Sequence, residues 1–286
     1  MTKTIGFVGL GNMGGNMAAR LMSAGYTVYG ESRTRERAQH LIDEGLQWRD
    51  TAREVAESSE IVFTSLPDDD ALKDVSESLL SGLASGKVWV DVSTVSPRAS
   101  RELAAKARGR GAEMLDAPVS GSVPQVQSGT LTIMVGGDEN AYREVEPVLR
   151  ELGTPTHVGG NGHGLALKLA INISLAVQML AFSEGLLLAE TDGVDRELAA
   201  KVMSESPIGS PMLKARVPLV LDLPDEAWFT VGLMEKDIRL AESLGEEIGV
   251  PVPTAAIADE WLTRARELGY ENRDIAALYE TLRRRA

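Results

Sequence analysis

Residues 3–34 read KTIGFVGLGNMGGNMAARLMSAGYTVYGESRT, and this stretch decides the fold of the N-terminal half. A β-rich apolar run at 4–8 is followed by a glycine-rich break and then by apolar residues at helical spacing, which end at Gly25. Gly9, Gly11 and Gly14 form G-x-G-x-x-G. Without side chains there, the chain can turn tightly, admit a pyrophosphate to the helix N-terminus and pack the helix against the strand. The order strand, turn, helix therefore predicts a dinucleotide-binding turn made of Gly9, Leu10, Gly11, Asn12, Met13 and Gly14.

The end of the second predicted strand decides which dinucleotide is favoured. A ribose is expected about 20 residues beyond the glycines, where a site for NAD places an acid. Here the chain reads Glu31, Ser32, Arg33, Thr34. If strand alternation points Ser32 at the ribose, Glu31 points away, and Ser32, Arg33 and Thr34 form a pocket for the 2′-phosphate of NADP. The alternative is that Arg33 is a solvated surface residue and that Glu31 binds the ribose of NAD.

Further strands and helices alternate as far as residue 137. Buried strands are predicted in EIVFTSLP (60–67), KVWVDVST (87–94), AEMLDAP (112–118) and GTLTIMVGG (129–137), which indicates a doubly wound α/β domain of Rossmann type. Ligands bind beyond the carboxyl ends of such strands, where the chain places 66–67, 93–94 and 117–122. For Ser93 and Thr94, which precede Ser96-Pro97, helix capping is an adequate alternative explanation.

The second half of the chain is predicted to be helical. Residues 163–190 contain no proline and are apolar on almost every face, but polar residues interrupt them too often for a membrane span. We expect a Rossmann-type domain (1–161), a long interdomain helix (162–191) and an all-α domain (192–286) for substrate binding and oligomerisation. Lys168 and Asn172 lie one turn apart on the long helix, where a buried lysine needs a function or a partner. Lys168 could equally extend its amine to solvent, and the adjacent charges of Lys236 and Asp237 usually mark a solvated face.

Composition excludes several other classes of protein. The chain has 286 residues, 43% of them hydrophobic, and a net charge of −13, which is typical of a soluble globular protein and argues against nucleic acid as a partner. It has no cysteine, which excludes disulfides and thiolate catalysis, and its three histidines lie far apart, so no metal site is expected. The first residues form no signal peptide, and we expect a cytoplasmic protein without a membrane partner.

Four motifs in order resemble the β-hydroxyacid dehydrogenase family, which includes 3-hydroxyisobutyrate dehydrogenase, tartronate semialdehyde reductase and glyoxylate/succinic semialdehyde reductases. The resemblance covers nearly the whole chain. GFVGLGNMG (6–14) is similar to the cofactor signature of the family, DAPVSGSVPQVQSGTLTIMVGG (116–137) to its substrate signature, GHGLALKLAIN (162–172) to its catalytic helix and KDIRLA (236–241) to a C-terminal signature. Ser32-Arg33-Thr34 resembles the NRT pattern associated with NADP.

The resemblance implies roles for the residues of these motifs. Lys168 would be the catalytic proton donor and acceptor, and Leu66, Pro67 and Thr94 would line the nicotinamide. The residues implied in substrate binding are Ser120, Gly121, Ser122, Asn172 and Lys236. Many members have glycine where this chain has Ser122, and the following VPQVQ matches no substrate subgroup, so the substrate stays open.

The expected protein is an NADP-dependent oxidoreductase that interconverts a small β-hydroxy acid and its aldehyde or keto acid as a homodimer or homotetramer. The alternatives are an NADPH-dependent imine reductase and a non-catalytic NADP-binding module. Lys168 argues against the first, because imine reductases typically carry another residue there. Binding modules tend to lose the catalytic lysine, so the presence of Lys168, Asn172 and Ser120 together argues against the second.

Overall fold

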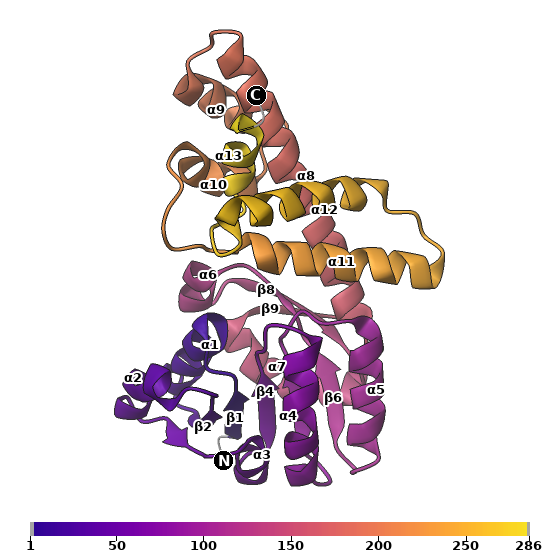
Figure 1. Cartoon of the computed structure of the whole chain (residues 1–286). Helices are drawn as coiled ribbons and strands as arrows, with labels where there is room; N and C mark the ends of the chain where they lie inside the picture. The colour runs from indigo at the N-terminus through magenta and orange to yellow at the C-terminus, as the bar shows by residue number, and fades with distance from the viewer. Residues whose placement is uncertain (1–2, 285–286) are drawn as a thin grey trace. The chain divides into compact units, whose positions relative to one another are not determined.

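The computed structural model describes residues 3–284 of the chain. The chain divides into two compact units, Met1–Lys168 and Leu169–Ala286, which are described here one at a time. Figure 1 shows the sheet in the first unit and the helices of the second.

The first unit is built on a nine-stranded sheet in the order β3-β2-β1-β4-β5-β6-β8-β7, with β9 paired to β8. The first six strands are parallel, as the alternation of strands and helices predicts. The strands are β1 (Thr4–Val8), β2 (Thr27–Glu31), β3 (Gln47–Trp48), β4 (Ile61–Thr64), β5 (Val88–Asp91), β6 (Glu113–Asp116), β7 (Val119–Ser120), β8 (Leu131–Gly136) and β9 (Gly153–Gly159).

The far edge of the sheet is mixed. β8 is antiparallel to β6 and β7 and parallel to β9. β9 was not predicted from the sequence, because its two glycines and its proline disfavour a strand locally. Pairing along β8 supplies the hydrogen bonds that hold it extended.

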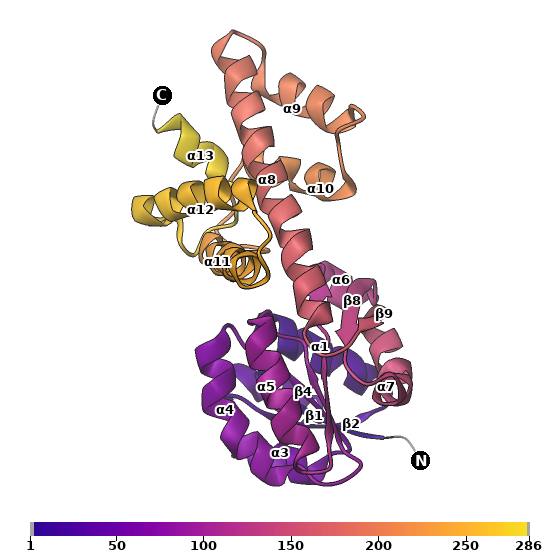
Figure 2. The same ribbon diagram turned by 90° about the vertical axis from the view of Figure 1, so that its right-hand side faces the viewer.

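Helices cover both faces of the sheet. One apolar cluster joins the sheet to α1, α2, α6 and α7, and a second joins it to α3, α4 and α5. Figure 2 shows α3, α4 and α5 on one side of β1 and β4, with α7 on the other. The helical segments of this unit are α1 (Asn12–Ser23), η1 (Arg35–Ala38), α2 (Gln39–Asp43), α3 (Ala52–Ser58), α4 (Asp69–Gly82), α5 (Pro97–Arg108), α6 (Val123–Ser128) and α7 (Glu139–Leu152).

The second unit is helical, and no strand occurs in its described part, as predicted. Its helices are the greater part of α8 (His163–Thr191), then α9 (Arg196–Glu205), α10 (Pro211–Leu221), α11 (Val231–Ile248), α12 (Pro253–Ala265), a π-helical turn η2 (Arg266–Tyr270) and α13 (Ala277–Arg283). A buried ion pair between Arg216 and Asp274, 2.6 Å long, links α10 to the segment before α13.

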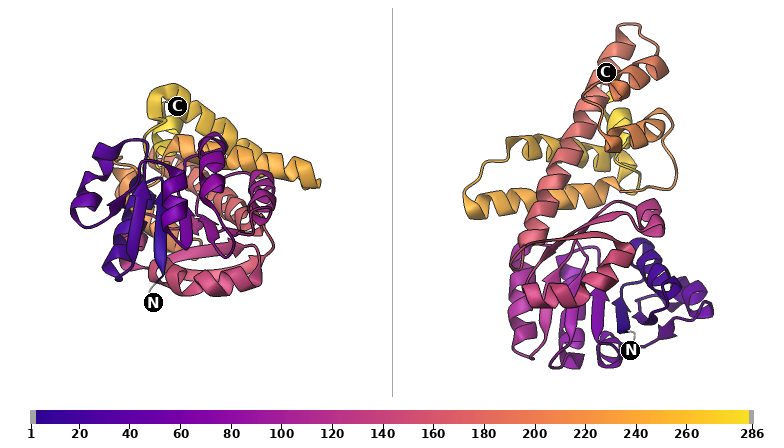
Figure 3. Two further views of the ribbon diagram at one scale, coloured as in Figure 1. Left: turned by 90° about the horizontal axis from the view of Figure 1, so that it is seen from below. Right: turned by 180° about the vertical axis from the view of Figure 1, so that it is seen from behind.

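α8 is a single helix of 29 residues, which Figure 3 shows unbroken. Its length and apolar composition would also suit a membrane span, and 39% of its most apolar window is buried inside the protein. Core helices of soluble proteins can have the same length and apolar composition. The apolar faces of α8 contribute Ala176, Met179, Leu180, Phe182 and Leu186 to the core of the helical unit.

Candidate active site

The glycine turn between β1 and α1 is shaped as a nucleotide site requires. Gly9 has a φ of +92°, and a Cβ at Gly9 would lie 2.3 Å from the Ser65 carbonyl oxygen. A Cβ at Gly14 would lie 2.1 Å from the carbonyl oxygen of Gly9, whereas one at Gly11 would meet no atom within 4 Å. Gly9 and Gly14 are therefore required by packing, and the open side at Gly11 leaves room for a pyrophosphate. Within residues 3–284 no side chain caps the α1 N-terminus, so its first N–H groups are available to an anion.

Side chains alternate between the two faces of β2. Val28 and Gly30 are buried toward the cluster that includes α1, while Tyr29 and Glu31 lie on the other face. Arg33, beyond the strand, is exposed. Burial raises the pKa of the Glu31 carboxyl, which disfavours the ionised form.

A cavity of about 530 Å³ adjoins the glycine turn. Arg37 and His40 line this cavity beside the turn, although neither was predicted to be a site residue. It is lined by Leu10, Gly11, Asn12, Gly15, Asn16, Ala19, Arg37, His40, Leu41 and Glu44.

A buried network joins the ends of β4 and β5. Asp91 is fully buried, and its Oδ1 accepts hydrogen bonds from the Thr64 hydroxyl at 2.7 Å and the Ser93 hydroxyl at 2.6 Å. Ser93 Oγ in turn accepts the Leu66 N–H at 2.9 Å. Burial raises the pKa of Asp91 to about 6, and the charge of Asp116 adds to this effect.

Helix capping explains only part of the 93–97 segment. Ser96 caps α5 by accepting the Ala99 N–H at 3.1 Å, and Pro97 begins the helix. Ser93 is instead part of the Asp91 network. Thr94, which lies between Ser93 and Ser96 in the sequence, is half-buried. The loops predicted to line the nicotinamide, 66–67 and 93–94, are thus linked to each other.

Asp116, the register partner of Asp91 on β6, binds the N-terminus of α8. Its Oδ1 accepts the Gly162 N–H at 2.7 Å and its Oδ2 the Leu165 N–H at 3.1 Å. The backbone approaches so closely that a Cβ at Gly164 would lie 2.4 Å from the Met134 carbonyl oxygen. The G-H-G motif therefore fixes the start of the helix that carries Lys168. The sequence did contain a signal for Asp91 and Asp116, since Asp91 ends an otherwise apolar strand and Asp116 follows the apolar Met114 and Leu115 at the end of β6.

The residues of the predicted substrate loop lie at one turn. Ser120 is half-buried at the end of β7 and pairs with Thr132 of β8. Gly121 has a φ of +134°, and its Cβ would lie 2.7 Å from Leu131 Cδ2, so glycine is required there. Ser122 precedes α6, and both its N–H and its hydroxyl donate to Gln125 Oε1 at 2.9 Å. Ser122 and Gln125 of the VPQVQ segment thus support each other as a cap.

In the helical unit, a hydrogen bond between Asn172 and Asp237 joins the third and fourth motifs. The Asn172 amide donates to Asp237 Oδ2 at 2.5 Å, and Lys236 Nζ lies 2.8 Å from Asp237 Oδ1. Asn172 is fully buried, and its Oδ1 has no hydrogen-bond partner within residues 3–284. Asp237 therefore orients Asn172 and leaves its carbonyl oxygen as an acceptor. Lys168 is itself 9% exposed, one turn before Asn172 on α8.

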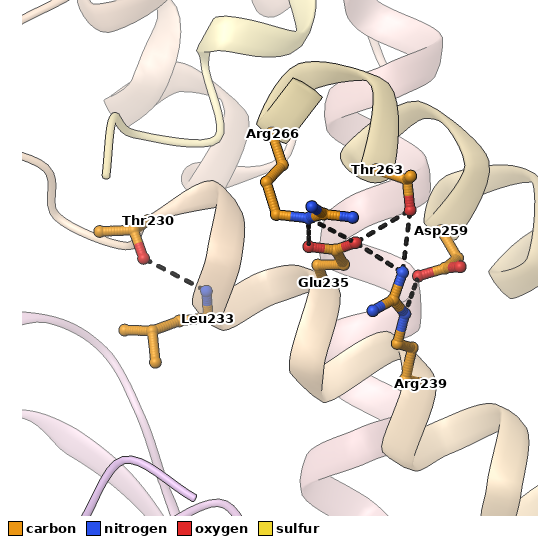
Figure 4. Close-up of polar contacts among 7 residues, drawn as sticks. All are labelled: Thr230, Leu233, Glu235, Arg239, Asp259, Thr263 and Arg266. Atoms are coloured by element: carbon orange, nitrogen blue, oxygen red, sulfur yellow. Dashed lines mark hydrogen bonds and ion pairs between the residues drawn. The ribbon is translucent and has the colours of Figure 1, made fainter. Parts of the chain in front are cut away.

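A second cluster holds α11 in place (Figure 4). The buried Glu235 carboxylate accepts from Arg239 at 2.6 Å, Thr263 at 2.9 Å and Arg266 at 2.9 Å. Arg239 also donates to Asp259 at 2.9 Å. Glu235 and Arg239 thus secure α11 to α12 and η2, while the neighbouring Asp237 turns to α8.

Comparison with known protein families agrees with this arrangement. Residues 4–160 match the NAD binding domain of 6-phosphogluconate dehydrogenase, and residues 162–282 match the NAD-binding domain of NADP-dependent 3-hydroxyisobutyrate dehydrogenase. The chain belongs to the β-hydroxyacid dehydrogenase family.

Individual relatives are similar over almost the whole chain. Glyoxylate/succinic semialdehyde reductase 2 of Arabidopsis thaliana is 32% identical over 99% of this chain and 80% of its own length. 2-(Hydroxymethyl)glutarate dehydrogenase of Eubacterium barkeri is 34% identical over 96% of this chain and 93% of its own. The solved 3-hydroxyisobutyrate dehydrogenase of Mycobacterium tuberculosis with L-serine has a TM-score of 0.88 and 31% identity, and covers 99% of this chain and 100% of its own.

The protein is accordingly a dehydrogenase or reductase of the family, an NAD(P)-dependent oxidoreductase that acts on CH–OH donors. Its glycine turn fits a pyridine nucleotide. Among residues 3–284, no group of three or more histidine and acidic side chains is placed to bind a metal.

Proposed function

We propose that the protein interconverts a small β-hydroxy acid and the corresponding aldehyde or keto acid, with NADP as cofactor and Lys168 as proton donor and acceptor. The observation that carries the proposal is the environment of Lys168. It is 9% exposed on a long apolar helix, one turn before the buried Asn172. A lysine extended into solvent would be far more exposed, so burial favours a functional amine over a surface one.

The nicotinamide, when bound, exchanges a hydride with the carbinol carbon of the substrate. Lys168 then has to handle the proton of the hydroxyl. In reduction its ammonium polarises the carbonyl and donates a proton to the oxygen, and in oxidation the neutral amine accepts that proton. Oxidation should therefore be favoured by higher pH. Asp116 holds the first turn of α8 by hydrogen bonds, and this fixes the backbone position from which the Lys168 side chain extends.

We assign the substrate carboxylate to the Ser120 hydroxyl and the Gly121 N–H, as the family resemblance implies. The same resemblance implies a substrate-binding role for Lys236 of the helical unit. The pairing of Ser120 with Thr132 of β8 and the positive φ of Gly121 define the conformation of that turn, which supports the assignment. Ser122 has its hydroxyl engaged with Gln125, so we assign it to support of the turn. Asn172 would orient the substrate through its unpartnered Oδ1.

We assign the preference for NADP to Ser32, Arg33 and Thr34. Glu31 lies on the face of β2 opposite Val28 and Gly30, and Arg33 is exposed just beyond the strand, where it can meet a 2′-phosphate.

A homodimer or homotetramer is proposed from the surface of the helical unit. Its exposed apolar side chains include Leu188 (74% exposed), Leu198 (54%), Val202 (58%) and Ile208 (69%). So many exposed apolar residues on α8, α9 and the loop after α9 are typical of a subunit interface. Light scattering should give at least twice the 30.7 kDa mass of the chain.

The test of the proposed function is a screen of NADPH oxidation. Glyoxylate, succinic semialdehyde, tartronate semialdehyde and methylmalonate semialdehyde are compared with cyclic imines and with acetaldehyde. Turnover of a carbonyl acid in preference to acetaldehyde supports the proposal. Preference for a cyclic imine, or NADPH binding without turnover of any compound, would favour the imine reductase or the binding module instead.

A further inference from the structure

We propose that Asp91 is a positioning residue that acts through Ser93 to hold the two loops beside the nicotinamide in one arrangement. The inference rests on the proposed function only for placing Leu66 and Thr94 beside the nicotinamide ring. The hydrogen bonds themselves lie within the first unit of the chain.

Proton counting fixes the direction of each bond in the network. A serine hydroxyl has one proton, and Ser93 Oγ accepts the Leu66 N–H at 2.9 Å, so its own proton is available to Asp91 Oδ1 at 2.6 Å. Thr64 is arranged in the same way. Its Oγ1 accepts the Trp89 indole N–H at 2.9 Å and donates to the same Oδ1 at 2.7 Å. Asp91 Oδ1 thus accepts both hydroxyl protons. Because the Ser93 proton points to Asp91, a lone pair of Ser93 Oγ faces the Leu66 N–H.

The location of Ser93 gives this bond its consequence. The parallel ladder between β4 and β5 ends where the Val92 N–H donates to the Thr64 carbonyl at 2.9 Å. Immediately beyond that hydrogen bond, the Ser93 hydroxyl links the two strand ends by accepting the Leu66 N–H. A second connection, from the Ser96 N–H to Asp69 Oδ1 at 2.8 Å, lies farther along both loops. The Asp91–Ser93 pair therefore controls the segments next to the strands, where the predicted nicotinamide contacts occur.

Thr64 supplies a matched control within the same network. Both hydroxyls donate to Asp91 Oδ1, and both are buried. The Thr64 hydroxyl on β4, however, accepts from the interior Trp89, whereas the Ser93 hydroxyl accepts from Leu66 in a loop. If the network merely stabilises the fold, removal of either hydroxyl should have similar effects. If Asp91 positions the loops, only removal of the Ser93 hydroxyl should alter hydride transfer.

The experiment compares Ser93→Ala with Thr64→Val in the full-length protein. With the best substrate of the screen, Ser93→Ala should lower kcat about tenfold, which is the effect of one lost buried hydrogen bond. The primary isotope effect with C4-deuterated NADPH should rise, since hydride transfer becomes more rate-limiting. The dissociation constant for NADPH should change less than about threefold, because the pyrophosphate and 2′-phosphate bind elsewhere. Thr64→Val should melt at a lower temperature yet keep the isotope effect of the wild type.

Two further variants test whether Asp91 acts through Ser93. Asp91→Asn keeps an acceptor oxygen and should retain at least about a third of kcat. Asp91→Ala removes the acceptor, so it should lower kcat as much as Ser93→Ala, and the double variant should lose little more. Additive losses in the double variant would overturn the inference, as would equal isotope effects in Ser93→Ala and Thr64→Val.

Amide hydrogen exchange provides a readout that does not depend on turnover. The Leu66 N–H should exchange at least about tenfold faster in Ser93→Ala than in Thr64→Val, measured by NMR on the NADPH-bound protein. If the wild type reduces none of the compounds in the screen, the proposed function fails, and this measurement alone then decides the inference. Equal exchange at Leu66 in both variants would refute it.

Discussion

Replacement of Asp91 by asparagine should change how the stability of the protein depends on pH. Asp91 is fully buried at the end of β5, and burial raises its pKa from 3.8 to about 6. An acid with a raised pKa binds its proton more tightly in the folded state than in the unfolded state. Ionised Asp91 therefore lowers stability. This penalty is absent below the unfolded pKa, grows between the two values and is complete above pH 6.

The magnitude follows from the difference between the two pKa values. About two pH units correspond to about 3 kcal/mol of unfolding free energy, of which about 2.5 kcal/mol develops between pH 4 and pH 7.5. Asparagine carries no charge and has no such dependence. Its amide nitrogen costs stability where Asp91 Oδ2 has no partner in the described part of the chain, but this cost is independent of pH. The variant should therefore gain about 2.5 kcal/mol relative to the wild type as the pH rises from 4 to 7.5.

Melting temperatures measured in parallel at several pH values provide the assay. For a domain of this size the gain corresponds to about 5–10 °C in the melting-temperature difference between variant and wild type. The exposed Asp74→Asn, on α4, is the control and should show no comparable trend. A melting-temperature difference between Asp91→Asn and the wild type that stays constant from pH 4 to 7.5 would refute the argument, because Asp91 would then titrate alike in the folded and unfolded protein.

Three further predictions follow from other residues. Lys168→Ala should lower kcat by about 10²-fold or more while the affinity for NADPH barely changes, and steady-state kinetics with fluorescence titration will check both; a near-normal kcat would remove Lys168 from the mechanism. Arg33→Ala should reduce kcat/KM with NADPH at least about tenfold and leave NADH almost unaffected, so equal losses with the two cofactors would contradict the assignment of the 2′-phosphate. Arg216→Ala should destabilise the helical unit by about 3–5 kcal/mol in thermal or urea denaturation, because it leaves the buried Asp274 without its charged partner. A loss below about 1 kcal/mol would mean that the backbone N–H groups of Trp228 and Phe229 are enough to stabilise that carboxylate.

Local sequence determined the parts of this protein that depend on short-range chemistry. The glycine turn could be predicted because only glycine fits where a Cβ would collide with the Ser65 or Gly9 carbonyl oxygen. The parallel sheet and the long helix α8 could be predicted because apolar periodicity reflects burial directly. Lys168 and Asn172 could be singled out because a polar residue in an apolar helix stands out from its neighbours.

Tertiary structure alone decided which polar groups meet. β9 is extended only because β8 supplies its partners, and the pairing of Asp91 with Asp116 depends on the register of β5 and β6. Likewise, Asp237 looked like half of a solvated charge pair, yet it is buried against Asn172, 65 residues away. Hydrogen bonds between distant segments have no local signature, since they depend on a distance of about 3 Å that only the folded chain establishes. The sequence therefore contained the reactive groups, and the fold determined how they are oriented.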